Sequence, residues 1–358
     1  MADSNLIKCG LAASLLYLLP ALAIVAGPRT GAFTMSFTQT TSLADGDEIA
    51  HRMLHRIVYE DRRSNHEVLA GQSIDPTKES WQVYVPESYT GAEAYGVLVW
   101  VSPFDSGRLP DGWRNGLEDH KLIYVGADRS GNGQGVMDRR VPLALTGLAN
   151  IEAAYKVDSA RIYIGGFSGG GVTASRIAAA YADVFTGGLY VSTSEGIGTE
   201  DVPVPSSDRY VLMQTRNRYA FTSGDEEGTN KIMNTRAEDA YRGLCVLRLE
   251  FIHIPNATHA NLEPRYFSRA LKFLDEPKPV DPADQADCEK QRDGRRAAAI
   301  DAIRQAFTAG DRDKAHDLLI ALHQSFGPLA EPEFSHYAGC LNGNTLSTDC
   351  LGKPTGGG

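Results

Sequence analysis

Short apolar runs recur along this chain, and segments with helical spacing of apolar residues separate them. The runs lie at 81–86, 96–101, 121–127, 161–166, 187–193, 209–214 and 248–254, with helices expected at 141–155 and 173–182 among others. Continuous apolar runs are typical of central parallel strands, which helices cover on both faces. The alternation therefore predicts an α/β fold with a mostly parallel sheet between two helical layers.

Composition agrees with a folded protein and excludes one large class of partner. Hydrophobic residues make up 42% of the 358 residues and charged residues 22%, which is ordinary globular usage. The formal charge is −10 and the isoelectric point is near 5.4. Binding to a phosphate backbone relies on an excess of basic residues, so nucleic acid is not expected as a partner.

The N-terminal segment predicts export. Lys8 precedes an uncharged run, 9–26, that contains Pro20 and has small residues at Ala23 and Ala26. This pattern favours a cleaved signal peptide at 1–26 and a secreted or periplasmic protein. The run is also about long enough to span a bilayer, so a retained N-terminal anchor is the alternative. No second run approaches membrane length.

Four cysteines follow the signal segment, an even number in a compartment that permits disulfides. They are Cys245, Cys288, Cys340 and Cys350. Three pairings are possible. We favour Cys340–Cys350, which brackets a polar loop with little else to hold it, and Cys245–Cys288 would then follow. In the alternative, one or both pairs remain reduced. No CxxC pair is present, so structural zinc is disfavoured.

The chain divides into a main domain at 27–275, a linker at 276–288 and a helical hairpin with a cysteine-bounded loop at 289–352. The linker is predicted because acids and prolines cluster there, and the hairpin because two helical stripes meet at Gly310. The stripes consist of Ile300, Ile303 and Phe307, then Ala315, Leu318, Leu319, Leu322 and Phe326. A single helix pair cannot bury its own apolar face. The hairpin should therefore dock on the main domain or on a protein partner.

The sharpest chemical signal is the hexapeptide GFSGGG at 166–171, which lies between an expected strand and an expected helix. In a Gly-x-Ser-x-Gly elbow, the strand turns abruptly into the helix and exposes the serine at the edge of the sheet. Ser168 is thus the candidate nucleophile, and the backbone N–H of Gly169 is a candidate oxyanion donor. The alternative is a glycine-rich connection without catalytic function.

A serine nucleophile needs a base, and His259 is in the right place along the chain. It lies in a loop after the last expected strand, 248–254, and before a closing helix. His253 also falls in this region, but inside the strand. The alternative is that His259 is a surface histidine of a loop.

Two other patterns do not indicate a cofactor or a metal. His51 and His55 are four residues apart on an expected helix at 49–59, but a metalloprotease helix would need glutamate at the position of Arg52. The glycine-rich stretch at 131–135 lacks the spacing of a dinucleotide-binding loop. We expect that stretch to be a loop at the same sheet edge as the elbow, and we expect no cofactor and no metal.

From about residue 81 to 275, the chain resembles the α/β-hydrolase superfamily, and within it the secreted polyhydroxybutyrate depolymerases and feruloyl esterases. The resemblance rests on WQVYVPESY at entry, GFSGGG at the elbow and NATHANLEP near the end. It implies a serine esterase that acts through an acyl-enzyme. Ser168 matches the nucleophile of these enzymes, and His259 matches the base.

The chain departs from that family at the second oxyanion donor. Such esterases usually carry His-Gly after the strand that precedes the first covering helix, whereas this chain has Ser102-Pro103-Phe104. Proline has no N–H to donate. Phe104 is therefore the candidate for the second donor.

A further departure concerns the triad acid. The family often shows Gly-x-x-Asp after the strand that we expect at 209–214, and this chain reads TRNRY at 215–219 instead. Asp225, Glu226 and Glu227 follow slightly later, and Glu195 ends the preceding strand. We favour Asp225 narrowly over Glu195, and the alternative is that Asp225 belongs to a solvated acidic loop.

Three functions are compatible with these residues. The first is an exported serine carboxylesterase that acts on a small-molecule or polymeric ester through Ser168 and His259. The second is a non-catalytic descendant, a binding or scaffold protein that uses the C-terminal hairpin. The third is a peptidase, which would share every residue named and differ only in its substrate pocket.

Overall fold

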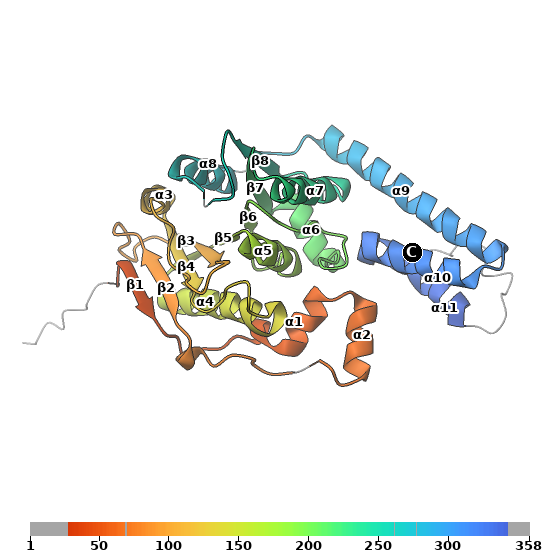
Figure 1. The fold of residues 1–358 in the computed structure, drawn as a ribbon, viewed down its shortest axis with the longest axis horizontal. Coiled ribbons are helices and arrows are strands. Elements are labelled where there is room, and N and C mark those ends of the chain that lie inside the picture. Colours follow the sequence, from red (N-terminus) through yellow and green to blue (C-terminus); the bar gives the residue numbers. More distant parts are fainter. Residues whose placement is uncertain (1–27, 69, 261, 277, 343–358) are drawn as a thin grey trace, which may run out of the picture.

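The computed structural model describes residues 28–342 except 69, 261 and 277. Eight strands form one sheet in the order β1-β2-β4-β3-β5-β6-β7-β8 (Figure 1). The strands are β1 (Gly31–Met35), β2 (Trp81–Val85), β3 (Tyr95–Val101), β4 (Leu122–Ala127), β5 (Val157–Phe167), β6 (Gly187–Val191), β7 (Arg218–Gly224) and β8 (Leu249–Ile254). β2 is antiparallel to β1 and β4, and every other neighbouring pair is parallel. The protein has the α/β-hydrolase fold that its sequence predicts.

Eleven α-helices surround or extend this sheet within the described residues. They are α1 (Gly46–Met53), α2 (Arg56–Ser64), α3 (Arg114–Asp119), α4 (Val141–Ala154), α5 (Gly169–Ala180), α6 (Ser207–Thr215), α7 (Thr229–Gly243), α8 (Pro264–Asp275), α9 (Pro282–Thr308), α10 (Arg312–Phe326) and α11 (Glu331–Asn342). A five-residue π-helix, η3 (Val136–Arg140), leads directly into α4. The expected helix at 141–155 is confirmed, and the one at 173–182 begins earlier, directly after the elbow.

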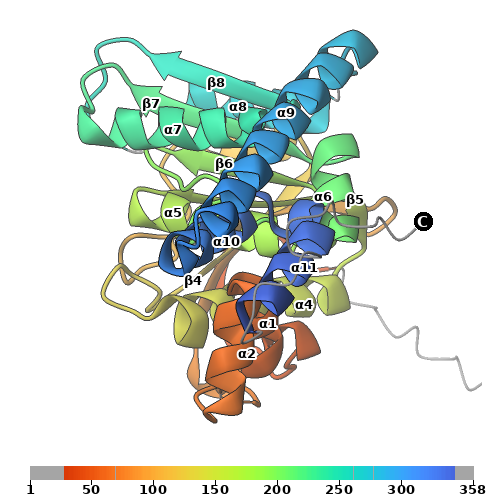
Figure 2. The same cartoon turned by 90° about the vertical axis from the view of Figure 1, so that its right-hand side faces the viewer.

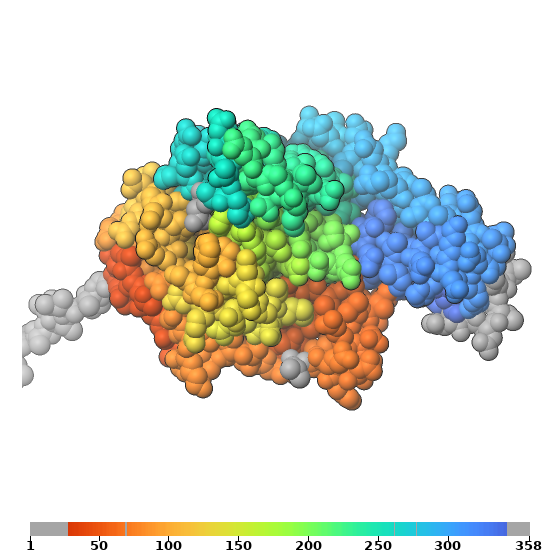
Figure 3. Space-filling model, in the orientation of Figure 1, coloured from red at the N-terminus to blue at the C-terminus, as the bar shows by residue number. Residues whose placement is uncertain are grey.

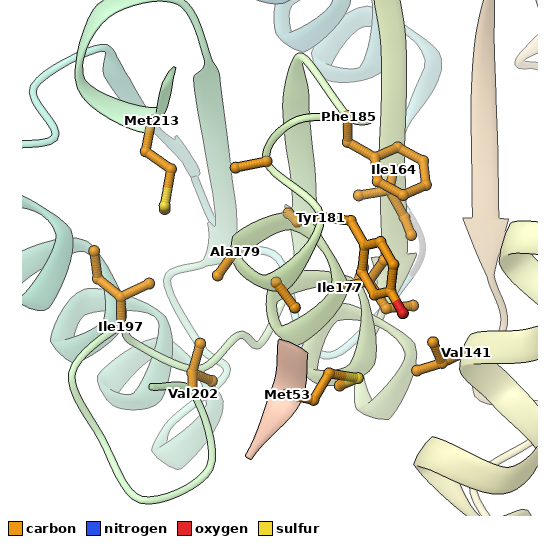
Figure 4. Packing of buried hydrophobic residues seen from close by; sticks show 14 of the residues in the cluster. Met53, Val141, Ile164, Ile177, Ala179, Tyr181, Phe185, Ile197, Val202 and Met213 are labelled. Atoms are coloured by element: carbon orange, nitrogen blue, oxygen red, sulfur yellow. The ribbon is translucent and has the colours of Figure 1, made fainter. Parts of the chain in front are cut away.

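Two apolar cores lie on opposite faces of the sheet. α3 and α8 cover one face, where Trp113 stacks on Phe267 with ring centroids 3.8 Å apart. α4 and α5 cover the other face, and their core continues through α1 and α6 (Figure 4). Burial on both faces explains why most strands are continuous apolar runs.

One expected strand is wrong. Residues 209–214 lie in α6, and the strand that follows is β7, which the apolar pattern misses. In α6, Tyr210 and Met213 are buried while Val211 between them is half exposed, which is helical spacing. All seven residues of β7 are buried, but Arg218, Thr222 and Ser223 make it too polar to be recognised as a central strand.

The expected helix at 49–59 is also interrupted. Leu54 and His55 have extended backbone between α1 and α2, because His55 turns into the core and its Nε2 pairs with the Thr199 carbonyl at 2.9 Å.

Both helical stripes of the C-terminal region are confirmed, although that region holds three α-helices rather than a hairpin of two. The connection is shorter than the expected linker at 276–288, since α9 begins at Pro282.

The C-terminal helices dock on the main domain. α9 extends from the main domain, and α10 and α11 pack beside it (Figures 1 and 2), so the three helices form the end of the molecule in the space-filling view (Figure 3). A disulfide joins Cys245 to Cys288 in α9, as the cysteine pairing predicts. Arg56 of α2 pairs with Glu331 of α11 at 2.5 Å, and the apolar core is continuous across the contact.

Two expectations concern residues that the structure does not describe. The signal peptide at 1–26 lies outside the described residues, as does Cys350 of the expected Cys340–Cys350 pair. Among the described helices, none is both long enough and apolar enough to cross a membrane.

Candidate active site

The elbow at the end of β5 holds Ser168 in a strained backbone conformation. Its φ is 54° and its ψ is −128°, a region that L-residues rarely adopt and that is found mainly at functional sites. A Cβ on Gly166 would lie 2.3 Å from the Gly170 carbonyl carbon, and one on Gly170 would lie 2.0 Å from the Val101 carbonyl oxygen. Only glycine fits at these two positions, so the turn has the close packing that the elbow pattern requires.

The structure brings Ser168 and His259 together. Ser168 Oγ lies 2.8 Å from His259 Nε2, a hydrogen-bond distance between groups 91 residues apart in sequence. The imidazole packs against the ring of Phe167, with centroids 4.8 Å apart and the ring planes tilted by 31°, and Phe167 is itself buried. His253 does not compete, because its side chain is exposed on β8, where it stacks on Phe251.

Backbone hydrogen bonds hold the loop after β7 against the loop that carries His259. The Asp225 N–H donates to the Ile254 carbonyl at 3.1 Å, and the Glu226 N–H donates to the Ala257 carbonyl at 3.0 Å. The two loops approach so closely that a Cβ on Gly224 would lie 2.2 Å from the Ala257 oxygen. The acidic loop is therefore fixed beside the imidazole.

Glu227 is the carboxylate that faces His259. Its Oε1 lies 3.7 Å from His259 Nδ1 and accepts a 2.5 Å hydrogen bond from Ser192 Oγ, and the glutamate side chain is only 2% exposed. Burial raises the pKa of Glu227, while the Ser192 hydroxyl and His259 act to lower it. Within the described residues, its Oε2 is buried without a hydrogen-bond partner.

The other three carboxylates considered from the sequence have different partners. Asp225 is exposed and pairs with Lys231 at 2.9 Å, so the structure does not bring it to the imidazole. Glu195 forms a two-pronged ion pair with Arg176, at 2.7 and 2.9 Å. Glu226 is exposed on the loop. With β7 ending at Gly224, the Gly-x-x-Asp pattern that the resemblance implies falls on Gly224 to Glu227, with glutamate at the position of the acid.

Asn230, at the start of α7, was not predicted from the sequence. Its side-chain amide lies 2.9 Å from His259 Nδ1, closer than Glu227. Two proton arrangements fit these distances. If the amide N–H donates to Nδ1, then Nε2 carries the proton and donates to Ser168 Oγ. If Nδ1 carries the proton, it donates to the amide oxygen after the Asn230 amide turns over, and Nε2 is free to accept from Ser168; Glu227, at 3.7 Å, is beyond hydrogen-bond distance of Nδ1.

The two candidate oxyanion donors stand on neighbouring segments. Gly169 is the first residue of α5, so its N–H lies at the positive end of a helix dipole. The Phe104 N–H donates to Ser102 Oγ at 3.1 Å, and the Phe104 side chain is 62% exposed. In this arrangement the N–H of Phe104, the second candidate donor, is already hydrogen-bonded to the Ser102 hydroxyl.

The glycine-rich stretch at 131–135 packs on both of these segments. The Asn132 N–H donates to the Pro103 carbonyl at 3.0 Å, and a Cβ on Gly169 would lie 2.2 Å from the Asn132 side-chain oxygen. This places the loop at the same sheet edge as the elbow, as expected.

A cavity of about 410 Å³ borders the Ser102–Phe104 segment. Most of its apolar lining comes from Trp100, Pro103, Phe104 and Leu109, and the lining residue Arg108 pairs with Asp111 at 2.6 Å.

The described residues contain no group of three or more histidine, cysteine, aspartate or glutamate side chains that could hold a metal ion. His51 and His55 have protein partners instead.

No protein-family model and no curated protein matches this chain. Its fold resembles that of solved structures. An S-formylglutathione hydrolase from Staphylococcus aureus covers 68% of this chain and 98% of its own, with 11% identity and a TM-score of 0.46. A ferulic acid esterase covers 68% and 99%, with 14% identity and a TM-score of 0.45. The LpqC poly(3-hydroxybutyrate) depolymerase from Bordetella parapertussis covers 59% and 88%, with 18% identity and a TM-score of 0.39.

Proposed function

We propose that this protein is a serine hydrolase that cleaves carboxylic esters through an acyl-enzyme on Ser168. The observation that carries the proposal is the 2.8 Å contact between Ser168 Oγ, on a strained elbow, and His259 Nε2. A hydroxyl is a weak nucleophile until an adjacent base takes its proton, and this geometry supplies such a base.

The reaction follows from the positions of these groups. His259 Nε2 removes the Ser168 proton as Oγ attacks the ester carbonyl carbon, and the carbonyl oxygen becomes an oxyanion beside the Gly169 N–H. The intermediate collapses, and the leaving alcohol takes the proton from Nε2. Water then attacks the acyl-enzyme by the same sequence of proton transfers and restores Ser168.

Glu227 is proposed as the third member of the triad in place of Asp225. Its carboxylate stabilises the positive charge that His259 acquires in the transition state and favours the proton on Nδ1. The separation of 3.7 Å shortens to a direct hydrogen bond if the imidazole turns slightly away from Asn230. Apo sites often tighten in this way when the substrate binds.

Phe104 is proposed as the second oxyanion donor, and its N–H must first leave Ser102 Oγ. The oxyanion is a stronger acceptor than a hydroxyl, because hydrogen bonds to ionised acceptors are about twice as strong as those between neutral groups. The exchange therefore occurs when charge develops on the substrate. This donor contributes in the transition state more than in the ground state, which is the requirement for catalysis.

The substrate proposal is an ester with an apolar group on one side. The cavity beside the oxyanion segment has room for such a group, and its lining of Trp100, Phe104 and Leu109 favours apolar contact. Export is proposed from the N-terminal segment, and the Cys245–Cys288 disulfide supports it, because such bonds persist in oxidising compartments.

The non-catalytic alternative loses its main support once Glu227 is considered. It depended on the absence of a triad acid and on the altered Ser102-Pro103-Phe104 segment. A buried carboxylate within 4 Å of His259 weakens the first point. A peptidase is not favoured by any particular contact.

Hydrolysis of p-nitrophenyl butyrate tests the proposal. The purified protein should release p-nitrophenol in multiple turnovers, and S168A and H259A should abolish the release. The proposal fails if the folded wild-type protein does not hydrolyse this and related short esters, or if S168A keeps full activity.

A further inference from the structure

A buried arginine lies behind the proposed oxyanion hole. Arg140, at the junction of the π-helix η3 and α4, is only 4% exposed. Single π-turns within helices are rare and occur frequently at functional sites. Neither the sequence pattern nor the proposed mechanism uses this side chain.

Among the residues that the structure describes, the guanidinium of Arg140 donates only to backbone carbonyls. Nε donates to Ser130 at 2.8 Å, one terminal nitrogen donates to Ser102 at 3.1 Å, and the other donates to Gly169 at 3.2 Å. These acceptors belong to three segments that meet at the elbow: the glycine-rich loop, the Ser102–Phe104 segment and the first turn of α5. A planar guanidinium presents its donors in a fixed fork, so one rigid group sets the separation of all three.

No carboxylate compensates this buried charge among the described residues. Burial, together with the positive charge of the nearby Arg176, lowers the pKa of Arg140 to about 10. Arg140 therefore remains charged at neutral pH. A buried cation without a carboxylate partner is costly, so its presence calls for a compensating contribution from its surroundings.

The carbonyls that Arg140 holds lie next to the two candidate donors. Gly169 supplies both a carbonyl to Arg140 and the first oxyanion N–H, and Ser102 lies two residues before Phe104. An oxyanion hole works only when its donors converge to within about 2.7–3.1 Å of the developing charge. The charge of Arg140 and the N-terminus of α5 both favour negative charge at this place.

We propose that Arg140 is a positioning residue that fixes the oxyanion hole by clamping the Gly169 and Ser102 backbones, and that its buried charge favours the oxyanion. The proposal rests on the proposed esterase function. It predicts that Arg140 acts on the transition state and leaves substrate binding almost unchanged.

The test compares R140M with R209M. Arg209 is a matched control because it is also buried, at 8% exposure, and donates to the Ala180 carbonyl at 2.7 Å at the opposite end of α5. R140M should lower kcat for p-nitrophenyl butyrate by about 100-fold, the loss typical of one oxyanion donor, with KM changed by less than about threefold. R209M should lower thermal stability comparably and leave kcat within about twofold.

A trifluoromethyl ketone separates positioning from a general structural role. Ser168 Oγ adds to its carbonyl carbon, the serine proton moves to His259, and a stable oxyanion occupies the hole. The inhibition constant in R140M should rise by the same factor as kcat/KM falls, because both report binding of the tetrahedral anion. R140K keeps the charge but cannot span three carbonyls, so its kcat should lie between those of R140M and the wild type. If R140M does not fold, R140K carries the same test.

The proposal is overturned if R140M behaves like R209M, if inhibitor binding is unchanged while kcat falls, or if R140K equals the wild type. These outcomes presuppose an active wild-type enzyme, and each of them leaves the esterase function intact. An inactive wild-type protein that also ignores the ketone would instead refute the esterase function, and the role of Arg140 with it.

Discussion

The two nitrogens of the His259 imidazole differ in how strictly the structure fixes the groups that contact them. On the Nε2 side, one hydroxyl at 2.8 Å comes from a backbone turn that tolerates only glycine at two neighbouring positions. On the Nδ1 side, an amide at 2.9 Å and a carboxylate at 3.7 Å share one nitrogen. The position of the proposed nucleophile is fixed by a tightly packed backbone turn, whereas the contact of the proposed acid with His259 depends on side-chain orientation. We therefore expect substitutions on the two sides to differ in size and in whether they can be rescued.

The largest effect should follow from S168A or H259A. Either variant should lower kcat by about 10⁶-fold, because nucleophile and base act as one unit. Steady-state hydrolysis of p-nitrophenyl butyrate measures the loss. H253A is the matched control, since His253 is an exposed histidine on β8, and it should retain wild-type activity. Comparable losses in H253A and H259A would refute the assignment of the base.

The next effect should follow from E227Q. Loss of the acid leaves the serine and base in place but removes the charge that stabilises protonated His259, so kcat should fall by about 10³- to 10⁴-fold. D225N is the matched control on the same loop and should stay within about twofold of the wild type. The opposite ranking, with D225N more damaging than E227Q, would restore Asp225 as the acid.

A substitution at Asn230 can place a carboxylate next to His259 Nδ1 when Glu227 is removed. In N230D, a carboxylate replaces the amide at 2.9 Å from Nδ1, so E227Q/N230D should regain at least about tenfold of the activity that E227Q loses. N230A alone should cost no more than about tenfold, because Glu227 remains. Pre-steady-state burst kinetics distinguish acylation from deacylation in these variants. No recovery in the double variant would mean that a carboxylate at this nitrogen is not what the acid contributes.

The smallest effect concerns stability. The pKa of Glu227 is raised in the folded protein, so its contribution to stability is greatest below the pKa of the unfolded chain and is lost as pH rises through the folded value. E227Q has no such loss. Its melting temperature should therefore exceed that of the wild type by an amount that grows from mildly acidic to neutral pH. E226Q, on the exposed neighbour, should show no pH-dependent difference, and a difference that shrinks with rising pH would contradict the account.

The sequence predicts the sheet and the turn at Ser168 because each has a local physical signature. The apolar runs mark strands buried on both faces, and the close packing at Gly166 and Gly170 requires the glycines that define the elbow. The order of elements along the chain then directs attention to His259. The Cys245–Cys288 pair was also predictable, since the four cysteines allowed few alternatives.

The sequence offers Glu227, the proposed acid, only as one of four candidate carboxylates, because the strand before it is unusually polar. β7 is buried along its whole length but contains Arg218, Thr222 and Ser223, whereas the apolar segment before it forms α6. The observed strand begins nine residues after the expected one, so the expected position of the acid motif also lies too early in the chain. Asn230 and Arg140 have no sequence signature, because their roles arise from contacts between segments distant in the chain.

The most direct test of the central claim is labelling with a fluorophosphonate, which reacts with a serine only when a base activates it. The wild-type protein should gain one adduct per chain, and fragmentation of the tryptic peptide 162–176 should place it on Ser168 rather than on Ser175, which is buried in α5. H259A should label far more slowly. A folded wild-type protein that remains unmodified, or an adduct on any other residue, would contradict the account.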